Sequence, residues 1–487
     1  MEMTLALFIA IPLVFGLVGW ALGIRWAIVS RIATLVGSLA SLVLALAFWI
    51  GGAPPTRLEL PWIPSMGASF SLSLDGLSLP FIALAGLLGI VAVIASWKGI
   101  DERVPFFHFN LSLVLAGING VFLASDLFLF AFMWELMLVP MFFVIDLWGH
   151  EGRHRAAVKF FIFTQAGGLL MIAAIAGLYV THGTSTGEWT FALDRLKASA
   201  GALPPTFQFL LMLGFFAGFA VKLPAFGLHA WLPDAHTEAP TAGSILLAGI
   251  LLKTGGYGLL RFAIPLFPDA SAAFAPIAMW IGAAGIVYGG VMALGQTDMK
   301  RLVAYSSVSH LGFVLVGIYS MQASGRNGAV VQMLSHGLST GALFMLVGAL
   351  QDRIGTRELG RMGGLAHAAP RMGVLGLVLT LALLGLPGMG NFVGELMVLF
   401  GAFKSVAAVA VVSGLGLILA MAYALRMFQM AFHGEAKEKR VVVDLSGIET
   451  ASLGLLLALL VWIGLYPRGV LAIISLALPG LTGGTAP

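Results

Sequence analysis

The stretch FAVKLPAFGLHAWLPDAHTEAPT, residues 219–241, puts a lysine and a proline inside an apolar run. Lys222 precedes Pro224 by two residues, and two histidines, His229 and His236, follow. A charged side chain at the centre of a bilayer costs at least ~2.5–3.5 kcal/mol on insertion scales, so such residues are usually functional. Proline breaks or kinks a helix, and the freed backbone groups need new partners, which a water-filled cavity can supply. The stretch therefore predicts a broken membrane helix beside a functional lysine.

The surrounding chain has the composition of a polytopic membrane protein. Of its 487 residues, 59% are hydrophobic and 10% are charged, and the mean hydropathy is +1.00. A soluble domain carries roughly a quarter charged residues. Apolar runs of about 20 residues, each long enough to cross a bilayer, recur from end to end. The N-terminal run lacks a basic start and an obvious cleavage site, so we expect it to be a retained first helix.

The apolar runs predict an all-α fold with about 14 transmembrane helices in a single membrane domain, residues 1–487. The longest polar interruptions between the runs are residues 51–76, 181–205 and 433–447, and none has the composition of a separate soluble domain. The predicted helices span residues 3–23, 28–50, 77–97, 106–124, 127–147, 157–180, 207–227, 241–263, 273–294, 302–321, 327–350, 371–403, 406–431 and 450–475.

The order of the helices predicts an internal repeat. Helices four to eight (106–263) and helices nine to thirteen (273–431) form two blocks of five, flanked by peripheral helices in 1–97 and 450–475. Because five is odd, the second block enters the membrane from the opposite face, which makes the repeat inverted. Helix seven is broken at KLPAFG and helix twelve at GLPGMGNF. Paired breaks of this kind indicate a transporter's working site, although Gly and Pro are common in membrane helices in any case.

The distribution of lysine and arginine predicts the orientation in the membrane. Sixteen of the 26 basic residues lie in one set of alternate loops and seven lie in the other set. The positive-inside rule places the first set in the cytoplasm, so that both termini lie on the outer side. Of the remaining three residues, Arg426 is expected to snorkel from a helix end, whereas Lys222 and Lys253 are expected to be buried.

Ionisable residues at membrane depth are the strongest functional signal in the sequence. Burial lowers the pKa of a lysine and a nearby carboxylate restores it, so movement of Glu135 relative to Lys222 would switch the lysine between holding and releasing a proton. Histidine, with an ordinary pKa of about 6.5, suits relay between such groups. The six candidate residues are Glu135, Lys222, Lys253, His310, His336 and Glu395.

Each candidate also has a purely structural interpretation. Glu135 and Lys222 could form a static buried pair that specifies packing, and Lys253 could snorkel to a helix end. The two histidines could be core residues that donate to carbonyl groups, and Glu395 could lie at a cavity mouth. Four polar residues after Lys222 could simply cap and solvate a cytoplasmic loop. These four are His229, Asp234, His236 and Glu238.

Several other chemistries are excluded or disfavoured. The chain has no cysteine, which excludes disulfides and thiolate-held iron–sulfur clusters and disfavours a zinc site. No P-loop, dinucleotide-binding fingerprint or nucleophile elbow occurs in a suitable context. The GAAGIVYGG run, residues 282–290, predicts a close-packing helix face. We expect no cofactor or metal site in this chain and no nucleic-acid partner.

Five segments of the sequence resemble one family. AVKLPAFGLHAWLPDAHTEAPTAGSILLAGILLKTGGYGLLR (220–261), DMKRLVAYSSVSHLGFVLVG (298–317) and LSHGLSTGALFMLVG (334–348) are similar to the antiporter-like subunits of respiratory complex I and of multisubunit cation/proton antiporters. SDLFLFAFMWELMLVPMFFVI (125–145) and GLPGMGNFVGELMVL (385–399) resemble the complex I branch. Other antiporter-like subunits usually carry lysine in place of its helix-twelve glutamate. The resemblance extends over nearly the whole chain.

The resemblance implies a fold and a role for each candidate residue. It implies fourteen helices with inverted five-helix repeats, and proton translocation within a proton-pumping NADH–quinone oxidoreductase. Glu135 matches the family's helix-five glutamate and Lys222 its helix-seven lysine, the pair that gates a half-channel. Lys253 matches the central lysine of helix eight. His310 and His336 match the central relay toward the terminal carboxylate of helix twelve.

The resemblance also implies where the redox chemistry lies. The chain itself is expected to bind no FMN, iron–sulfur cluster or quinone, which belong to partner subunits. Expected partners are the other membrane subunits of complex I, especially the antiporter-like subunits L and N, and the lipid bilayer. The expected location is the bacterial inner (cytoplasmic) membrane, with both termini on the periplasmic side. Two alternatives stay open: a subunit of a multisubunit Na⁺/H⁺ antiporter, and a membrane scaffold whose charged pairs are static.

Overall fold

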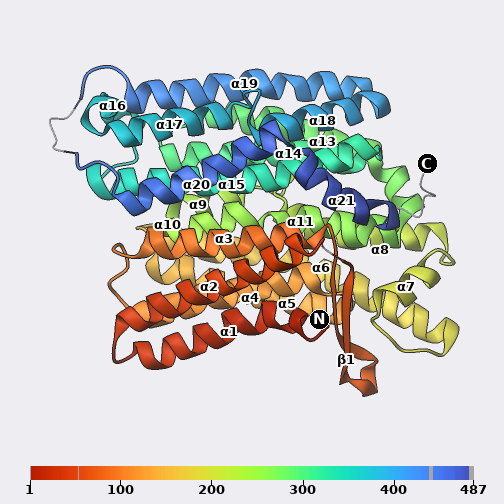
Figure 1. Ribbon diagram of the computed structural model, residues 1–487. Coiled ribbons are helices and arrows are strands. Elements are labelled where there is room, and N and C mark those ends of the chain that lie inside the picture. The colour runs from red at the N-terminus through yellow and green to blue at the C-terminus, as the bar shows by residue number, and fades with distance from the viewer. Residues whose placement is uncertain (1, 53, 438–441, 482–487) are drawn as a thin grey trace.

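The fold is a bundle of long helices that run side by side, with one β-hairpin at one end (Figure 1). The computed structural model describes residues 2–52, 54–437 and 442–481, and it describes the side chains up to residue 475 and that of Ala477 within the last helix. Lys439 and Arg440, two of the sixteen basic residues expected in the cytoplasm, and the C-terminal residues 482–487 lie outside the described residues.

The elements follow one another in four groups along the chain. The first comprises α1 (Thr4–Gly23), α2 (Ala27–Ile50), β1 (Thr56–Ile63), η1 (Pro64–Met66), β2 (Ala68–Leu74) and α3 (Ser78–Ser96). The second comprises α4 (Val104–Leu123), α5 (Leu127–Trp148), α6 (Arg153–Thr186), α7 (Leu193–Ala200), α8 (Pro205–Lys222), α9 (Trp231–Glu238), α10 (Thr241–Leu246), η2 (Leu247–Leu251), α11 (Lys253–Gly258), η3 (Leu259–Ala263) and α12 (Ile264–Leu266).

The last two groups complete the bundle. The third comprises α13 (Pro268–Leu294), α14 (Met299–Tyr319), α15 (Ala323–Ile354), η4 (Leu359–Arg361), α16 (Leu365–Ala368), α17 (Pro370–Leu383), α18 (Gly390–Ser405) and α19 (Ala407–Phe432). The fourth comprises α20 (Gly447–Leu465) and α21 (Arg468–Leu481).

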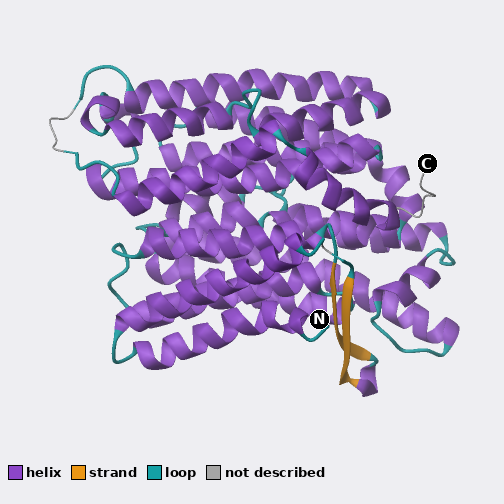
Figure 2. Cartoon of the chain, viewed as in Figure 1, coloured by secondary structure: helices purple, strands orange, loops and turns teal. Residues whose placement is uncertain are grey.

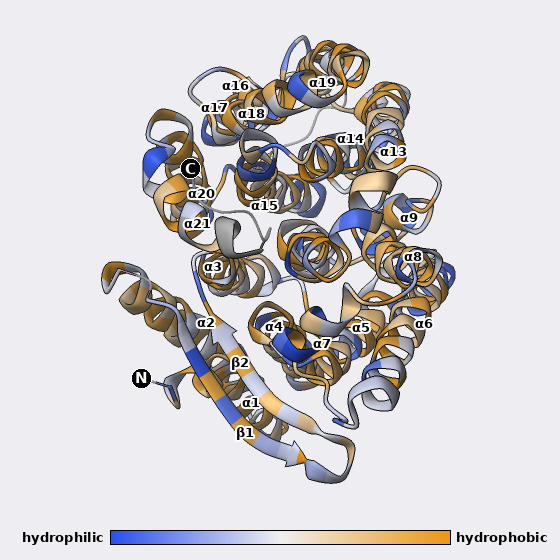
Figure 3. Cartoon of the chain, turned by 90° about the vertical axis from the view of Figure 1, so that its right-hand side faces the viewer, coloured by the Kyte–Doolittle hydropathy of each residue, from blue (hydrophilic) through white to orange (hydrophobic). Residues whose placement is uncertain are grey.

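The helical membrane fold predicted from the sequence is confirmed. Within the described residues, thirteen helices are long and apolar enough to cross a membrane, with α10 to α12 counted as one continuous span, Thr241–Leu266. The remaining predicted span is helix twelve, which is divided into α17 and α18. Viewed along their axes, the helices carry mostly hydrophobic residues on the outside of the bundle, where the lipid would lie (Figure 3).

Both predicted helix breaks are present. α8 ends at Lys222 and α9 begins at Trp231, whereas α17 ends at Leu383 and α18 begins at Gly390. In the second break Gly385 has a φ of +73°, a left-handed conformation that residues with a Cβ rarely adopt. The sequence located the breaks because proline and glycine at these positions cannot continue a regular helix.

Three features of the secondary structure differ from the prediction. The expected all-α fold contains a two-stranded antiparallel sheet, β1–β2, in a region expected to be a polar loop (Figure 2). The alternation of serine with apolar residues in β2, ASFSLSL, is the strand signal that the helix-centred interpretation overlooked. The predicted last helix, 450–475, is divided at Pro467 into α20 and α21. The predicted eighth helix contains two π-helical segments, η2 and η3.

Burial separates a central layer from the outer helices. The apolar windows of Thr241–Leu266, α14 and α15 are buried throughout. By contrast, only 33%, 39% and 28% of the apolar windows of α1, α2 and α20 are buried, as expected of peripheral helices, whereas α3 is mostly buried although it was expected at the periphery. α13 approaches α14 closely, and the lack of a side chain at Gly282 permits this approach. A Cβ on Gly282 would lie only 2.8 Å from the Gly312 carbonyl oxygen. This packing agrees with the helix face predicted for residues 282–290.

The hairpin is tied to the bundle through two carboxylates, the buried Asp126 and the partly buried Asp75. Asp126 caps α5 by accepting hydrogen bonds from Phe128 N and Leu129 N, and it also accepts one from Ser69 N of β2. Asp75, directly after β2, forms an ion pair of 2.6 Å with Arg261 on η3. The first contact fixes the start of the helix that carries Glu135, and the second joins the hairpin to the buried central span.

Loss of the Asp75–Arg261 pair is expected to destabilise the protein in a pH-dependent way. Burial alone would raise the pKa of Asp75, but Arg261 and hydrogen bonds from Ser78 and Leu77 outweigh it and hold the pKa below its ordinary value of 3.8. Because the folded pKa is depressed, the stabilisation is present above about pH 4 and is lost as the pH falls through the folded value. Asp75→Asn should cost ~3–5 kcal/mol at neutral pH, as for a broken buried pair.

Thermal unfolding of the detergent-solubilised protein between pH 3 and 7 tests this expectation. The control is Asp194→Asn, which removes the exposed Arg57–Asp194 pair and should change stability by no more than ~1 kcal/mol. Equal effects of the two substitutions at pH 7 would contradict the assigned role of Asp75.

Candidate functional site

The structure places the six candidate residues in two separate groups. Lys253, His336, His310 and Glu395 form one chain of contacts in the buried centre of the bundle, and all four are at most 1% exposed. Glu135 and Lys222 lie on α5 and at the end of α8, and no described contact joins them to the first group. The central group comes from four segments, α11, α15, α14 and α18, three of which belong to the fully buried layer.

Lys253 is held by a carbonyl group and a histidine. Its Nζ donates to the carbonyl oxygen of Ala248 and lies 2.8 Å from His336 Nδ1. The π-helical register of η2 departs from the regular α-helical hydrogen-bond pattern directly before the lysine, which is a recurrent feature of functional sites. A lysine ammonium has only donors, so whenever Lys253 is protonated His336 Nδ1 accepts.

Close packing brings Lys253 and His336 together. A Cβ on Gly337, the residue after His336, would lie 2.5 Å from the carbonyl oxygen of Gly249 and 3.5 Å from Lys253 Cε. The absence of a side chain at residue 337 thus lets α15 approach η2. Sequence distance gave no indication of this contact, because the two residues are 83 positions apart.

Glu395 lies in a cluster of three hydrogen-bonding side chains. Its Oε1 is 2.8 Å from His310 Nδ1 and accepts from Gln332 Nε2 at 3.1 Å. The hydroxyl of Tyr423 on α19 lies 3.1 Å from His310 Nε2. The cavity-mouth interpretation of Glu395 is wrong, because the carboxylate is buried. The histidine likewise pairs with a carboxylate and a hydroxyl instead of a backbone carbonyl.

Gln332 and Tyr423 are site residues that the sequence interpretation missed. Gln332 lies four residues before His336 on α15, and this spacing puts both side chains on one helix face. That spacing was the signal in the sequence that could have identified Gln332 as a site residue. Tyr423 gave no comparable signal, since one tyrosine in an apolar helix is usually a core residue.

The two hydrogen-bonded pairs meet at their histidines. The ring centroids of His310 and His336 are 5.8 Å apart, with the ring planes inclined by 56°. No described group bonds to His336 Nε2, although this atom is buried. Proton transfer between the rings therefore needs a bridging water or a ring rotation. With that step, the arrangement can carry a proton along Lys253, His336, His310 and Glu395.

Glu135 and Lys222 are not in direct contact. Lys222 is 1% exposed, no described group bonds to its Nζ, and its Nζ lies 5.2 Å from the ring centroid of Trp134 and 5.7 Å from that of Phe160. Aromatic faces stabilise a cation at such distances. Glu135 interacts electrostatically with the Gln165 side chain and with Lys222. The geometry is that of two separated charges and differs from a static ion pair.

The backbone group freed by the first break finds a protein partner. The indole Nε1 of Trp231, on the far side of the break, donates to the carbonyl oxygen of Val221 at 3.0 Å. The second half of the broken helix is held at its C-terminal end as well. Lys300 Nζ donates to the Ala239 carbonyl and Arg357 donates to the Thr237 carbonyl, which suits the negative end of a helix dipole.

The polar residues after Lys222 divide between two roles. Asp234 forms ion pairs with Lys159 and Arg301, and Glu238 accepts a hydrogen bond from Gly152 N, so these two residues serve the bundle end as the loop interpretation expected. His236 does not, because it is fully buried in α9 and stacks on Phe344 with ring centroids 4.7 Å apart.

His229 also departs from the loop interpretation. It is 7% exposed, and its ring packs beside Phe226 and Tyr288.

Outside the membrane spans, burial together with Lys300 and Arg357 lowers the pKa of His150 to about 4, so His150 is uncharged at neutral pH.

Lys222 and Lys253 lie on neighbouring elements without a direct contact. A Cβ on Gly255, two residues after Lys253, would lie 2.5 Å from the Phe219 carbonyl oxygen on α8. Among the described residues no hydrogen bond joins the two ammonium groups, and no group of three or more His, Asp or Glu side chains is arranged to hold a metal ion. A proton would therefore pass between the two lysines only by way of water or of side-chain motion.

Known proteins share this sequence and this fold. A sequence model of the family described as NADH:quinone oxidoreductase/Mrp antiporter, TM, matches residues 124–421. The chain is 49% identical over 491 residues to NADH-quinone oxidoreductase subunit M of Escherichia coli (strain K12), with 96% of each chain covered.

Solved structures agree with the family match. A chain of respiratory complex I from Thermus thermophilus with bound NADH superposes with a TM-score of 0.88 at 34% identity, covering 99% of this chain and 100% of that chain. A chain of the Mrp complex from Dietzia sp. DQ12-45-1b has a TM-score of 0.86 at 24% identity, over 99% of this chain and 54% of that chain, and so shares the fold.

Removal of the Tyr423 hydroxyl is expected to slow proton movement through the cluster. Tyr423→Phe takes away the group beside His310 Nε2 and leaves a buried ring nitrogen without a partner, a change worth ~1–3 kcal/mol. Proton translocation should fall roughly tenfold, since each 1.36 kcal/mol of barrier is tenfold in rate. The control is Tyr319→Phe, because no described group bonds to the buried Tyr319 hydroxyl. Equal activity of the two variants would show that the Tyr423 hydroxyl is not part of the relay.

Proposed function

The chain belongs to the NADH:quinone oxidoreductase/Mrp antiporter family of membrane subunits, and we propose that it acts as the proton-translocating subunit M (chain 4) of a proton-pumping NADH–quinone oxidoreductase, complex I. In this role it carries no redox chemistry of its own. Redox energy released in partner subunits drives protons along its row of buried ionisable residues. The FMN, the iron–sulfur clusters and the quinone site belong to those partners, in line with a chain that has no cysteine.

One observation carries the proposal most directly. Lys253, His336, His310 and Glu395 form a contact chain in which each pair is at 2.8 Å and the two pairs meet at their histidine rings. Burying such groups costs several kcal/mol unless they are paired, so a membrane protein keeps them for a purpose. A lysine, two histidines and a carboxylate in line can each hold or pass one proton.

The separation of Glu135 and Lys222 supports a switching role. Lys222 rests against two aromatic rings and interacts with Glu135 from a distance. Closer approach of the carboxylate would favour the charged lysine, and withdrawal would favour proton release. Because α5 and α6 expose apolar residues such as Phe132 and Ile162 beside this region, a neighbouring subunit can reach the switch. The proposed neighbours are the antiporter-like subunits L and N.

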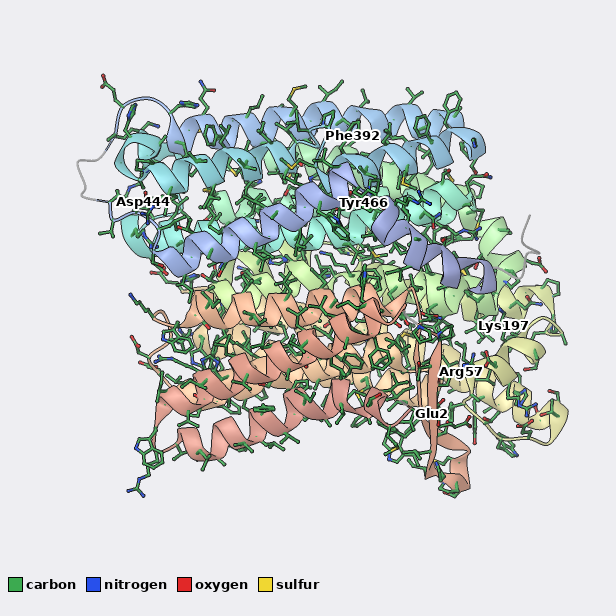
Figure 4. The ribbon with its side chains drawn as sticks, viewed as in Figure 1. Glu2, Arg57, Lys197, Phe392, Asp444 and Tyr466 are labelled. Carbon is green, nitrogen blue, oxygen red and sulfur yellow. The ribbon has the colours of Figure 1, made fainter. Side chains whose placement is uncertain are left out.

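The orientation and the repeat complete the proposal. We place the chain in the bacterial inner membrane with the hairpin end, which carries Glu2, Arg57 and Lys197, on the periplasmic side, together with both termini. Asp444 lies at the opposite end (Figure 4). The positive-inside rule favours this orientation, since the larger set of basic loops lies opposite the hairpin. The broken helices α8–α9 and α17–α18, one in each five-helix block, support the inverted repeat.

A subunit of a multisubunit Na⁺/H⁺ antiporter is the second candidate, because the family description and the shared Mrp fold both include it. The glutamate at residue 395, where other antiporter-like subunits usually carry lysine, weighs against it. Affinity purification of the chain from its native membrane distinguishes the two. Co-purification with an NADH-oxidising, iron–sulfur-rich assembly supports complex I, and a partner set without NADH oxidation supports the antiporter.

Substitution of either member of the switch is expected to uncouple the assembled complex. Glu135→Ala or Lys222→Ala removes one charge of the switch and should lower coupled turnover by ~10²-fold, the low end of the 10²–10⁴ contributed by positioned proton-transfer groups. NADH-driven proton uptake in membrane vesicles measures the effect, and native gels verify assembly. Lys404→Ala, at an exposed lysine on α18, is the control and should retain activity. Full activity in either switch variant would instead favour the static scaffold.

A further inference from the structure

Each carboxylate of the site leaves one buried oxygen without a donor. Among the described residues no group donates to Glu135 Oε1 or to Glu395 Oε2. For Glu395 the other oxygen is engaged, because His310 and Gln332 hold Oε1. Glu135 interacts with the Gln165 side chain. The unpaired oxygen of each carboxylate is free to receive a proton.

Each unpaired oxygen faces a glycine. A Cβ on Gly168, in the middle of α6, would lie 2.8 Å from Glu135 Oε1. A Cβ on Gly385, in the break between α17 and α18, would lie 2.7 Å from Glu395 Oε2. The two glycines belong to different blocks and different local structures, since Gly168 is helical and Gly385 has a φ of +73°. The same arrangement thus occurs at two independent places.

An unpaired oxygen of a buried carboxylate must find a donor from outside the protein's own groups. Leaving such an atom unsatisfied costs ~1–3 kcal/mol, and more when it is charged. Buried polar groups that lack a protein partner are commonly satisfied by water. A methyl group at either glycine would occupy the place from which a donor reaches the oxygen. Only glycine leaves that place open.

We propose that Gly168 and Gly385 are positioning residues that keep open a proton port, a water-sized site on Glu135 Oε1 and on Glu395 Oε2 whose ligand is water or a hydrated proton. The inference rests on the proposed function. When a hydrated proton reaches the port, an O–H bond forms on the carboxylate oxygen as the corresponding O–H bond of the carrier breaks, and a neutral water remains. The same O–H bond breaks when the proton passes on to the next acceptor, and at Glu395 the other oxygen keeps its protein partners throughout.

Gly168→Ala in the assembled complex tests the port at Glu135. The added methyl should displace the carboxylate or the donor, lower proton-coupled turnover about tenfold and shift its pH profile. Assembly should be unchanged, because the nearest atom is the end of a flexible side chain. The matched control is Gly177→Ala on the same helix, where the methyl would face Leu211 Cδ2 at 3.0 Å. Equal activity and equal pH profiles in the two variants would overturn the proposal.

A rescue experiment separates the port from a general packing effect. Asp is one methylene shorter than Glu, so in Gly168→Ala/Glu135→Asp the carboxylate retreats from the new methyl. The double variant should exceed Gly168→Ala several-fold and match Glu135→Asp alone, as expected for residues that couple directly. A double variant that loses as much as the two single changes together would show that Gly168 acts through packing.

The second port has its own matched pair. Gly385→Ala and Gly388→Ala both place a Cβ on a positive-φ residue of the same break, but at Gly388 the nearest atom is Leu465 Cδ2 at 3.7 Å. A larger loss of proton translocation in Gly385→Ala than in Gly388→Ala supports the port, and equal losses attribute the effect to backbone strain.

If Glu135→Ala is fully active as well as Gly168→Ala, the proposed function itself fails. If Glu135→Ala is impaired while Gly168→Ala is not, only the port is wrong.

Discussion

The hydrogen bond between Lys253 and His336 places the strictest demands on this structure. An ammonium group at membrane depth loses its hydration, and only polar partners in the protein can offset that loss. Lys253 obtains two such partners, the Ala248 carbonyl and His336 Nδ1. The π-helical segment before the lysine and the close approach at Gly337 both serve this contact. The helices that carry the contact form the most deeply buried layer of the bundle, where lipid cannot reach.

Glu395 and Lys222, at the two ends of the row of candidate residues, offset the loss of hydration in different ways. Glu395 lies in a hydrogen-bonded cluster with His310 and Gln332, where each polar group lowers the cost of burying its neighbours. Lys222 has aromatic faces around it and Glu135 at a distance. A cation held by rings and a remote charge is less firmly fixed than one held by hydrogen bonds. Under the proposed function, the Lys222 end is therefore the end that a neighbouring subunit would switch, and the Glu395 end is the end that would hold its proton in a defined place.

The helix breaks have a structural requirement that the sequence alone did not reveal. At the first break, Trp231 satisfies the Val221 carbonyl that a continuous helix would have paired, and the cations Lys300 and Arg357 satisfy carbonyls at the C-terminal end of α9. Water is then not needed to satisfy these groups and can serve the proton path. The second break uses Gly385 in a left-handed conformation, and that residue also faces the free oxygen of the terminal carboxylate.

The residues along the chain determined by themselves that this protein lies in a membrane, where its helices break and that Lys222, Lys253 and Glu395 are buried, because hydropathy, proline and charge act locally. They also placed Lys253, His310, His336 and Glu395 among the candidate residues. Only the tertiary structure decided which of these touch. It joined Lys253 to His336, kept Glu135 apart from Lys222, and added Gln332 to the cluster. Such contacts depend on the angle and distance at which helices far apart in sequence pack, and no local pattern encodes those quantities.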